Sequence, residues 1–331
     1  MNSYYYPTTL IVLDDDVDFL ASFALRFSDE PLLKIFSDPH QAIRYLFDSQ
    51  LNMLPLETFI SPYDGDAEPN CYNGDRLIRL RSAQVPGLLQ RPERFSQASV
   101  IVVDYDMAGF NGLQVCRAIS NLPVRRLLLT GKAGVETGVR ALNDGLIEGY
   151  FAKQDRDLAR ELRCGIARQR GAFFDILTSP FKAMLCADEM SFLTDASFEE
   201  ILSGYSRSVR SVEHYVTYGP PGILFVADNG TASWVLVTDE LGMKSHFEIA
   251  AEADAPHELK SLFAERRVIA FFPNLGGFYS SAYRASWRNY VTPARHFKGE
   301  RDWYHGSVGD SQQLSGFMDQ AVPLGRYLKG D

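Results

Sequence analysis

Short apolar runs, rich in β-branched and aliphatic residues as buried strands are, alternate with helix-like segments along the first half of the chain. The runs cover residues 8–13, 32–36, 99–104, 125–130 and 149–153. Behind each run, apolar residues recur every three or four positions, which is the spacing of one helix face. These segments lie at residues 17–27, 38–47, 112–120, 138–146 and 156–170. The alternation predicts an α/β fold, a five-stranded parallel sheet with helices on both faces.

Acidic and other polar residues stand directly behind four of these strands. In open α/β sheets the ligand crevice lies beyond the carboxyl ends of the strands, which share one edge. The residues placed there are Asp14, Asp15, Asp104, Thr130 and Lys153. We therefore expect their side chains to converge on one crevice and to form a site.

The motifs around these residues resemble, over about residues 8–170, the receiver domains of two-component response regulators. "LIVLDDD" is similar to the acidic pair of that family, and "VIVVDYDMAGFNGLQV" to its phospho-acceptor strand and turn. "LLLTG" is similar to the switch threonine with the small residue after it, and "EGYFAK" to the aromatic switch residue and the lysine. The resemblance implies a phosphorelay protein, with a cognate histidine kinase or phosphotransfer protein as its partner.

The resemblance also implies a role for each matching position. Asp104 would attack a phosphohistidine on the partner, and crowded carboxylates favour a hard, oxygen-seeking cation such as Mg²⁺. The implied metal-binding positions are Asp14, Asp15, Asp104 and the backbone carbonyl of Asp106. The implied phosphate-binding and switch positions are Thr130, Gly131, Lys153 and Tyr150. A phosphoryl group would draw the threonine inward and let the tyrosine turn, which predicts a homodimer strengthened by phosphorylation.

Two features depart from the family pattern. Gln154 follows Lys153 where the family usually has a proline, which puts the turn that aims the lysine in doubt. An insertion of about residues 51–97 separates the second helix from the third strand. Its stretch 75–95 contains arginines that could form a partner-binding face, or the insertion could be solvated with one short helix. We expect this receiver domain to cover residues 1–172.

The remaining residues, 173–331, predict a second domain of α+β type. The pattern favours a helix over 197–216, a hairpin around Asn229–Gly230, and strands at 244–252 and 266–273 on either side of a helix at 256–265. No output family is recognised, because helix-turn-helix, cyclase, phosphodiesterase and P-loop patterns are all missing from the sequence. No enzymatic signature indicates a reaction for this domain.

Residues 283–305 are denser in arginine and aromatic residues than any other stretch. The candidate output surface there consists of Arg284, Trp287, Arg288, Arg295 and Trp303. Such interleaving suits base stacking with phosphate pairing, and equally a protein interface or an ordinary mixed surface. His214 lies beside an acid on the expected helix, where it could be a phosphotransfer histidine or a capping or surface histidine.

Composition narrows the classes of function. A net charge of −9 makes nucleic acid a less favoured partner, although a local basic patch could still bind it. No run is apolar enough to span a membrane and no signal peptide is visible, so we expect a cytoplasmic protein. The four cysteines lack metal-site spacing. Two hypotheses remain for the output domain: control through protein contact or dimerisation, which the charge favours, and an enzyme or nucleic-acid-acting module.

Overall fold

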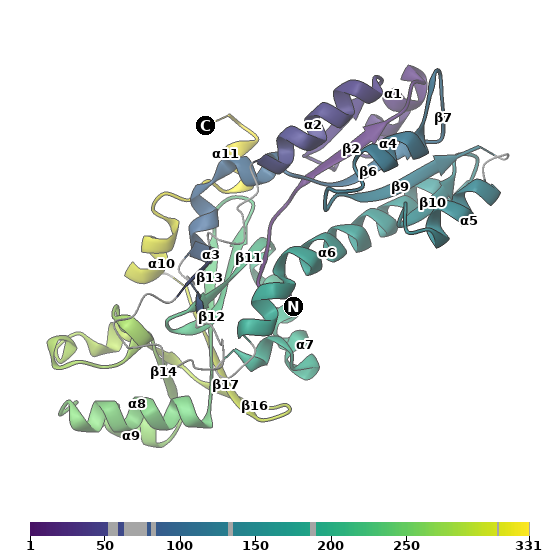
Figure 1. Cartoon of the computed structure of the whole chain (residues 1–331). Coiled ribbons are helices and arrows are strands. Elements are labelled where there is room, and N and C mark those ends of the chain that lie inside the picture. The colour runs from purple at the N-terminus through teal and green to yellow at the C-terminus, as the bar shows by residue number, and fades with distance from the viewer. Residues whose placement is uncertain are drawn as a thin grey trace. The chain divides into compact units, whose positions relative to one another are not determined.

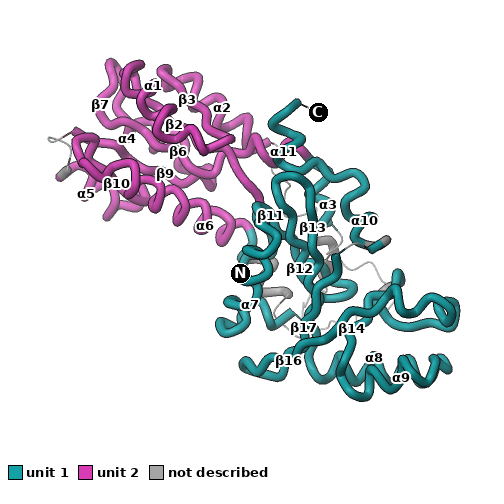
Figure 2. Tube along the Cα trace, turned by 180° about the vertical axis from the view of Figure 1, so that it is seen from behind, with its two compact units in different colours: residues 1–5, 55–91, 178–331 teal, residues 6–54, 92–177 magenta. Residues whose placement is uncertain are grey.

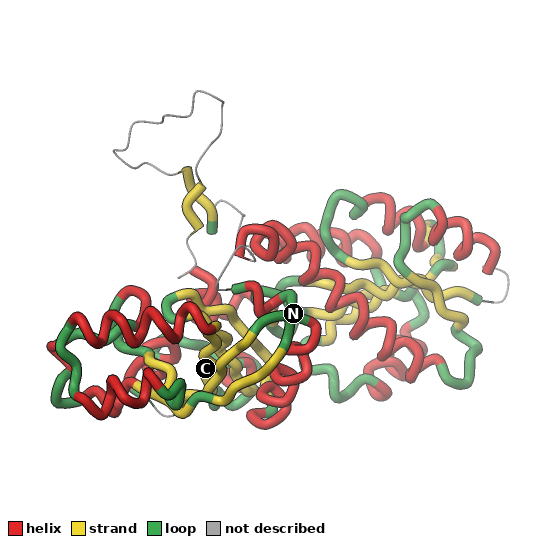
Figure 3. The backbone as a smooth tube through the Cα atoms, turned by 90° about the horizontal axis from the view of Figure 1, so that it is seen from below, coloured by secondary structure: helices red, strands yellow, loops and turns green. Residues whose placement is uncertain are grey.

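The computed structural model describes residues 1–51, 59–62, 78–80, 84–131, 135–185, 190–309 and 311–330. The chain divides into two compact units, coloured separately in Figure 2. The parallel-sheet unit comprises residues 6–54 and 92–177, and the antiparallel-sheet unit comprises residues 1–5, 55–91 and 178–331. Figure 3 shows that helices and strands are intermixed in both units. Among the described residues, no helix combines the length and the apolar character that crossing a membrane requires.

The parallel-sheet unit contains the five-stranded sheet that the apolar runs predict (Figure 1). Its strands are β2 (Thr9–Leu13), β3 (Leu33–Phe36), β6 (Ala98–Asp104), β9 (Arg125–Thr130) and β10 (Gly149–Ala152). They lie in the order β10-β9-β6-β2-β3, and every neighbouring pair is parallel. β2 and β6 are buried along their whole length, as central strands covered on both faces must be. The predicted α/β fold is confirmed.

Helices cover both faces of this sheet. They are α1 (Val17–Arg26), α2 (Pro39–Leu51), α4 (Gly112–Ala118), α5 (Val135–Asn143) and α6 (Leu158–Leu185). Apolar residues of α1 and α6 pack into one core cluster, and those of α2, α4 and α5 pack into another on the opposite face. α6 continues well beyond residue 170, where the sequence pattern predicts its end.

The antiparallel-sheet unit is built on a six-stranded sheet in the order β1-β11-β12-β13-β17-β16. Its strands are β1 (Tyr4–Tyr5), β11 (Ser211–Tyr218), β12 (Pro221–Ala227), β13 (Ala232–Asp239), β16 (Arg295–Lys298) and β17 (Asp302–Val308). The α-helices that follow α6 in the chain are α7 (Ala196–Val209), α8 (Glu240–Glu252), α9 (His257–Ala264), α10 (Gln312–Met318) and α11 (Leu324–Tyr327). β14 (Val268–Ala270) pairs with β15 (Val291–Pro293) beside them. The α+β class predicted for this region is confirmed, and the hairpin around Asn229–Gly230 forms as predicted.

The insertion before the third strand belongs largely to the antiparallel-sheet unit, which differs from the predicted grouping. Its described elements are β4 (Ile60–Pro62), β5 (Ile78–Leu80), α3 (Gln84–Gly87) and two short 3₁₀ turns at Leu88–Gln90 and Pro92–Ser96. α3 contacts β11, and the Leu89 carbonyl accepts a hydrogen bond from the Val322 amide at 2.9 Å. Val85, Leu88 and Leu89 are buried, so this end of the insertion is core rather than a solvated loop. The arginines at 76 and 81 lie outside the described residues.

The predicted helix over residues 197–216 is too long. α7 ends at Val209, and Arg210 adopts a left-handed conformation with φ of 53° that turns the chain into β11. Glu213 and Tyr215 on β11 are buried two residues apart, which is the periodicity of a strand rather than a helix. His214 therefore lies on a strand.

The strand predicted at residues 244–252 is wrong, because this segment is part of α8. Asp239 caps the helix by accepting a hydrogen bond from the Gly242 amide at 2.9 Å. Met243, His246 and Ala250 are the buried residues, and their spacing of three and four is that of one helix face.

Candidate functional site

The polar residues behind the strands come together at the carboxyl edge of the parallel sheet. Asp14 follows β2, Asp104 ends β6 and Lys153 follows β10. Lys153 Nζ lies 2.6 Å from Asp14 Oδ2 and 2.9 Å from Asp104 Oδ1. Both carboxylates are buried, with exposed fractions of 0% and 3%. The predicted convergence of these residues is therefore what the structure shows.

Asp15 completes a group of three carboxylates. One oxygen from each of Asp14, Asp15 and Asp104 lies within 4.8 Å of the others. Asp15 Oδ2 also accepts a hydrogen bond from the Ala108 amide at 2.7 Å, which links it to the turn after β6. Hard oxygen donors of this kind suit Mg²⁺, so the residues present fit the metal. Asp106, on β7 (Asp106–Met107), has an exposed side chain, and metal binding by its carbonyl stays a prediction.

The protonation of this cluster is strongly perturbed. Burial raises the pKa of Asp104 to about 6, although contact with Lys153 opposes the shift. Burial likewise raises the pKa of Asp14 above its ordinary value. For Lys153, burial alone would lower the pKa, but the contacts with Asp14 and Asp104 outweigh it and raise the pKa. The charged carboxylates thus need a positive partner, and a bound cation would supply a second one beside the lysine.

The turn after Asp104 approaches it so closely that only glycine fits at position 112. β7 and β8 (Phe110–Asn111) form a two-stranded turn, and a Cβ on Gly112 would lie 2.2 Å from the Asp104 carbonyl oxygen. Asn111 then begins α4 by accepting a hydrogen bond from the Gln114 amide at 3.0 Å. The "FNG" stretch therefore places the start of α4 against the backbone of the acceptor strand.

Two of the predicted switch residues, Thr130 and Tyr150, lie on β9, which is next to the acceptor strand β6, and on β10, which is next to β9. Thr130 is fully buried at the end of β9, and its hydroxyl donates a hydrogen bond to the Gly131 carbonyl at 2.7 Å. Tyr150 on β10 is half-buried, and its ring packs against Gly138 of α5, where a Cβ would lie 3.2 Å from Tyr150 Cγ. At Gly131, a Cβ would meet no atom of the described residues within 4 Å. A role for these residues in switching stays a prediction.

Phe19 is a residue of the site that the sequence pattern did not single out. Its ring on α1 lies beneath Lys153, with Nζ 4.6 Å from the ring centroid. The pattern assigned Phe19 to the apolar stripe of the first helix together with Phe23 and Phe27. The signal that could have found it is that this stripe begins directly behind the acidic pair.

The candidate output surface of the antiparallel-sheet unit is only partly a surface. Trp287 and Trp303 are buried, with exposed fractions of 3% and 1%, so their assignment to a surface is wrong. Trp303 donates a hydrogen bond to Asp195 Oδ2 at 2.9 Å, and Trp287 belongs to the apolar cluster around α9 and β14. Large aromatic rings gain most from burial, which explains why these two side chains turn inward.

All four arginines of residues 283–305 are exposed, but three of them are paired with acids, among them Arg301, whose Nη1 lies 3.4 Å from Asp239 Oδ2. Arg284 Nη1 lies 3.3 Å from Asp254 Oδ2, and Arg288 contacts Glu258. Arg295 is exposed on β16. Pairing with carboxylates reduces the positive potential that nucleic-acid phosphates would require.

His214 occupies a structural position on β11. Its Nε2 lies 3.1 Å from the Asn2 carbonyl oxygen, and its ring stacks on Tyr5 with centroids 5.8 Å apart. Burial lowers its pKa to about 4. The helix assumed for a phosphotransfer histidine does not exist here.

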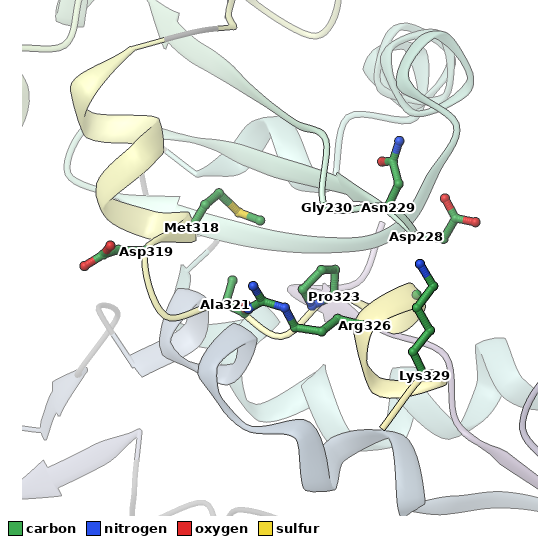
Figure 4. Close-up of a pocket in the computed structure, with 10 residues that line it drawn as sticks. Asp228, Asn229, Gly230, Met318, Asp319, Ala321, Pro323, Arg326 and Lys329 are labelled. Atoms are coloured by element: carbon green, nitrogen blue, oxygen red, sulfur yellow. The ribbon is translucent and has the colours of Figure 1, made fainter. Parts of the chain in front are cut away.

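The antiparallel-sheet unit has a cavity of about 590 Å³ between the β12–β13 turn and the C-terminal helices. Figure 4 shows the turn residues Asp228 and Asn229 on one side, and Arg326 of α11 with Lys329 just beyond that helix on the other. The charged side chains Asp228, Arg326 and Lys329 are exposed and include both signs. No residue predicted from the sequence as functional lines this cavity.

Comparison with known proteins identifies the fold. No protein-family model matches the sequence, and no curated protein matches it. The solved structure of the response regulator LqsR from Legionella pneumophila has a TM-score of 0.77 and 24% sequence identity, covering 99% of this chain and 95% of that one.

Two further solved structures match much more weakly. An adenylate cyclase from Rhodopirellula baltica has a TM-score of 0.35 and 16% sequence identity, and the match covers 54% of this chain and 97% of that one. A response regulator receiver domain protein from Clostridium thermocellum has a TM-score of 0.33 and 14% sequence identity, and the match covers 50% of this chain and 95% of that one. Similarities of that size do not define the fold of this chain. The chain therefore has the fold of the response regulator LqsR over almost its whole length, and the receiver fold that its sequence motifs predict is confirmed.

Proposed function

We propose that this protein is a two-component response regulator whose parallel-sheet unit accepts a phosphoryl group on Asp104 from a histidine kinase or phosphotransfer protein. The observation that carries the proposal is the bridge that Lys153 forms between the buried carboxylates of Asp14 and Asp104 at the edge of a receiver-type sheet. The similarity to LqsR over the whole chain supports the same class of protein. We expect it to act in the cytoplasm, where such kinases present their phosphohistidines.

The residues supply position and charge for the transfer. An Asp104 carboxylate oxygen attacks the phosphorus of the phosphohistidine, a P–O bond forms, and the P–N bond breaks as the imidazole, which already carries a proton on its other ring nitrogen, leaves as a neutral ring. Mg²⁺, held by Asp14, Asp15 and Asp104, would neutralise charge on the transferring group. Lys153 keeps its ammonium beside Asp104 throughout and pairs with the phosphoryl oxygens as they arrive.

The first test is metal-dependent phosphorylation of the full chain. Incubation with acetyl phosphate and Mg²⁺ should attach one hydroxylamine-sensitive phosphoryl group per chain, seen by intact-mass measurement. Removal of the metal with EDTA should abolish the modification, because the single charge of Lys153 is too small to offset the repulsion between the incoming phosphate and three carboxylates. Labelling at equal rate and extent in EDTA would contradict the proposed metal role.

For the output we propose control through dimerisation. Phosphorylation would offer Thr130 a charge-assisted hydrogen bond that competes with its present bond to Gly131, and the strand tip would move away from Tyr150. Beryllofluoride with Mg²⁺ should therefore raise the sedimentation mass toward that of a homodimer, and Thr130→Ala should weaken this shift. An identical mass with and without the phosphate mimic, over a wide range of concentrations, would contradict control by dimerisation.

The alternative for the antiparallel-sheet unit is an enzyme or a nucleic-acid-acting module. Counterion release predicts that binding to oligonucleotides through exposed arginines, such as Arg295, would weaken steeply with salt. The pairing of Arg284 and Arg288 with carboxylates makes this the less favoured function. A steep salt slope in a shift assay with single- and double-stranded oligonucleotides would reverse that preference.

A further inference from the structure

Phe19 provides Lys153 with a partner that carries no charge. The Lys153 ammonium lies over the face of the half-buried Phe19 ring, 4.6 Å from its centroid, while the same ammonium contacts Asp14 and Asp104. The negative face of an aromatic ring attracts a cation, and the attraction grows where water is excluded. Both carboxylates are buried and the lysine side chain is only 23% exposed, so much of the water is excluded here.

The Phe19 ring is itself held in place by its own helix. Phe19 and Phe23 have centroids 6.2 Å apart, and Phe23 stacks on Phe27 at 4.2 Å with an interplanar angle of 5°. The far end of this phenylalanine column (Phe19, Phe23 and Phe27) is covered by Arg163, whose Cζ lies 4.5 Å from the Phe27 centroid. Arg163 in turn forms two hydrogen bonds with Asp29, at 2.7 and 2.8 Å. The ring beneath Lys153 is thus one end of a packed column.

A fixed ring matters because nothing else described at the site holds the lysine independently of the carboxylates. Lys153 has a flexible four-carbon stem, and its backbone amide donates to the Thr130 carbonyl at 2.9 Å without restraining the side chain. Its ionic partners are Asp14 and Asp104, the same carboxylates that would hold Mg²⁺ and the phosphoryl group. If those oxygens held a metal ion, the ammonium would lose part of its anchoring, whereas its contact with the Phe19 ring does not involve the carboxylates.

We propose that Phe19 is a positioning residue for Lys153: its ring keeps the ammonium beside Asp104 while the carboxylates change partners. The proposal rests on the proposed phosphoryl transfer at this site. It predicts two separate effects of removing the ring, one on the free protein and one on binding of a phosphate mimic.

The first experiment observes Lys153 in the free, full-length protein by NMR with labelled lysine, assigned through Lys153→Arg. The ring current of Phe19 should shift the ε-CH₂ protons of Lys153 upfield in the wild type and in Phe19→Tyr, which keeps an aromatic face. In Phe19→Leu, which keeps an apolar side chain, the shift should disappear. An ordinary lysine shift in the wild type, or an unchanged shift in Phe19→Leu, would overturn the proposal.

The second experiment measures the affinity for beryllofluoride with Mg²⁺ by calorimetry. Phe19→Leu should weaken binding roughly 3-fold to 10-fold, the range of a partly desolvated cation–π contact, and Phe19→Tyr should restore it. The matched control is Phe47→Leu, which changes an exposed phenylalanine of α2 outside the site and should bind like the wild type. Wild-type affinity in Phe19→Leu would overturn the proposal.

A double-mutant cycle separates positioning from general packing. In a Lys153→Ala background, Phe19→Leu should cause no further loss of affinity, because the group that the ring positions is already gone. An equal loss in both backgrounds would mean that Phe19 acts through packing, and it would overturn the proposal. If the wild type itself fails to bind beryllofluoride, the proposed function fails, and the NMR shift alone then decides whether Phe19 holds Lys153.

Discussion

Asp104→Asn should abolish phosphorylation by acetyl phosphate or by a partner kinase. The substitution removes the attacking carboxylate oxygen but keeps the size of the side chain. The variant should fold normally, because burial raises the pKa of Asp104 to about 6 and the folded unit thus disfavours the charged form that asparagine lacks. The measurement is incorporation of hydroxylamine-sensitive phosphate, with thermal unfolding as the check on folding.

The matched control for this variant is Asp18→Asn. Asp18 is an exposed acid in the first turn of α1, close in sequence to the acidic pair but outside the carboxylate cluster. It should be labelled like the wild type. Labelling of a folded Asp104→Asn protein to the wild-type extent would show that another residue is the nucleophile.

Asp195→Ala should destabilise the antiparallel-sheet unit by about 3–5 kcal/mol. Asp195 is the buried cap of α7, where it accepts hydrogen bonds from the Ser197 and Phe198 amides, and it also accepts bonds from the Glu300 amide and Trp303 Nε1. Alanine would leave these donors without their carboxylate partner. Urea unfolding followed by tryptophan fluorescence should show the loss, because all three tryptophans of the chain lie in this unit.

The contribution of Asp195 to the stability of the antiparallel-sheet unit should also depend on pH. Burial alone would raise the pKa of Asp195, but the hydrogen bonds from Glu300, Trp303 and the helix start outweigh it and hold the pKa below its ordinary value. A lowered pKa stabilises the fold above the unfolded value of about 3.9, and this contribution is lost as the pH falls through the folded value. The difference between wild type and Asp195→Ala should therefore be full near neutrality and shrink in acid.

Glu258→Ala is the control for this loss of stability. Glu258 is exposed on α9 and pairs with Arg288 at the surface, so its removal should cost less than about 1 kcal/mol. A loss in Asp195→Ala no larger than in Glu258→Ala would show that the hydrogen bonds of Asp195 do not stabilise the unit.

The receiver-type unit was predictable because several independent signals agree there. β2 and β6 are continuous apolar runs, as strands buried on both faces must be; Asp14 directly follows β2, and Asp104 ends β6. The parallel topology then places Asp14, Asp104 and Lys153 at one edge without any knowledge of distances. The ring of Phe19 beneath Lys153 was not predicted, because an apolar stripe on a helix does not by itself reveal which of its members contacts a polar group, and only its position directly behind the acidic pair pointed to the site.

The antiparallel-sheet unit was harder to predict, because the contacts that decide its structure join residues far apart in the sequence. The apolar residues Phe247, Ile249 and Ala250 suit either a strand or a helix, and only the packing of this segment against α9 and β13 favours the helix α8. The dense aromatics near Trp303 suggest a surface from sequence, yet the buried carboxylate that receives the indole lies at Asp195, far away in the chain. Likewise β1 pairs with β11, so residues 1–5 belong to the antiparallel-sheet unit although they precede the parallel-sheet unit in the chain.

The most direct test of the account is to locate the phosphoryl group. The full-length protein would be treated with acetyl phosphate and Mg²⁺, reduced with borohydride to trap the acyl phosphate, and digested for peptide mass spectrometry. The account predicts a single reduced residue, Asp104, at the end of β6 beside Lys153. Reduction at Asp14 or Asp15 instead, or no reduced aspartate in a protein that has taken up phosphate, would contradict it.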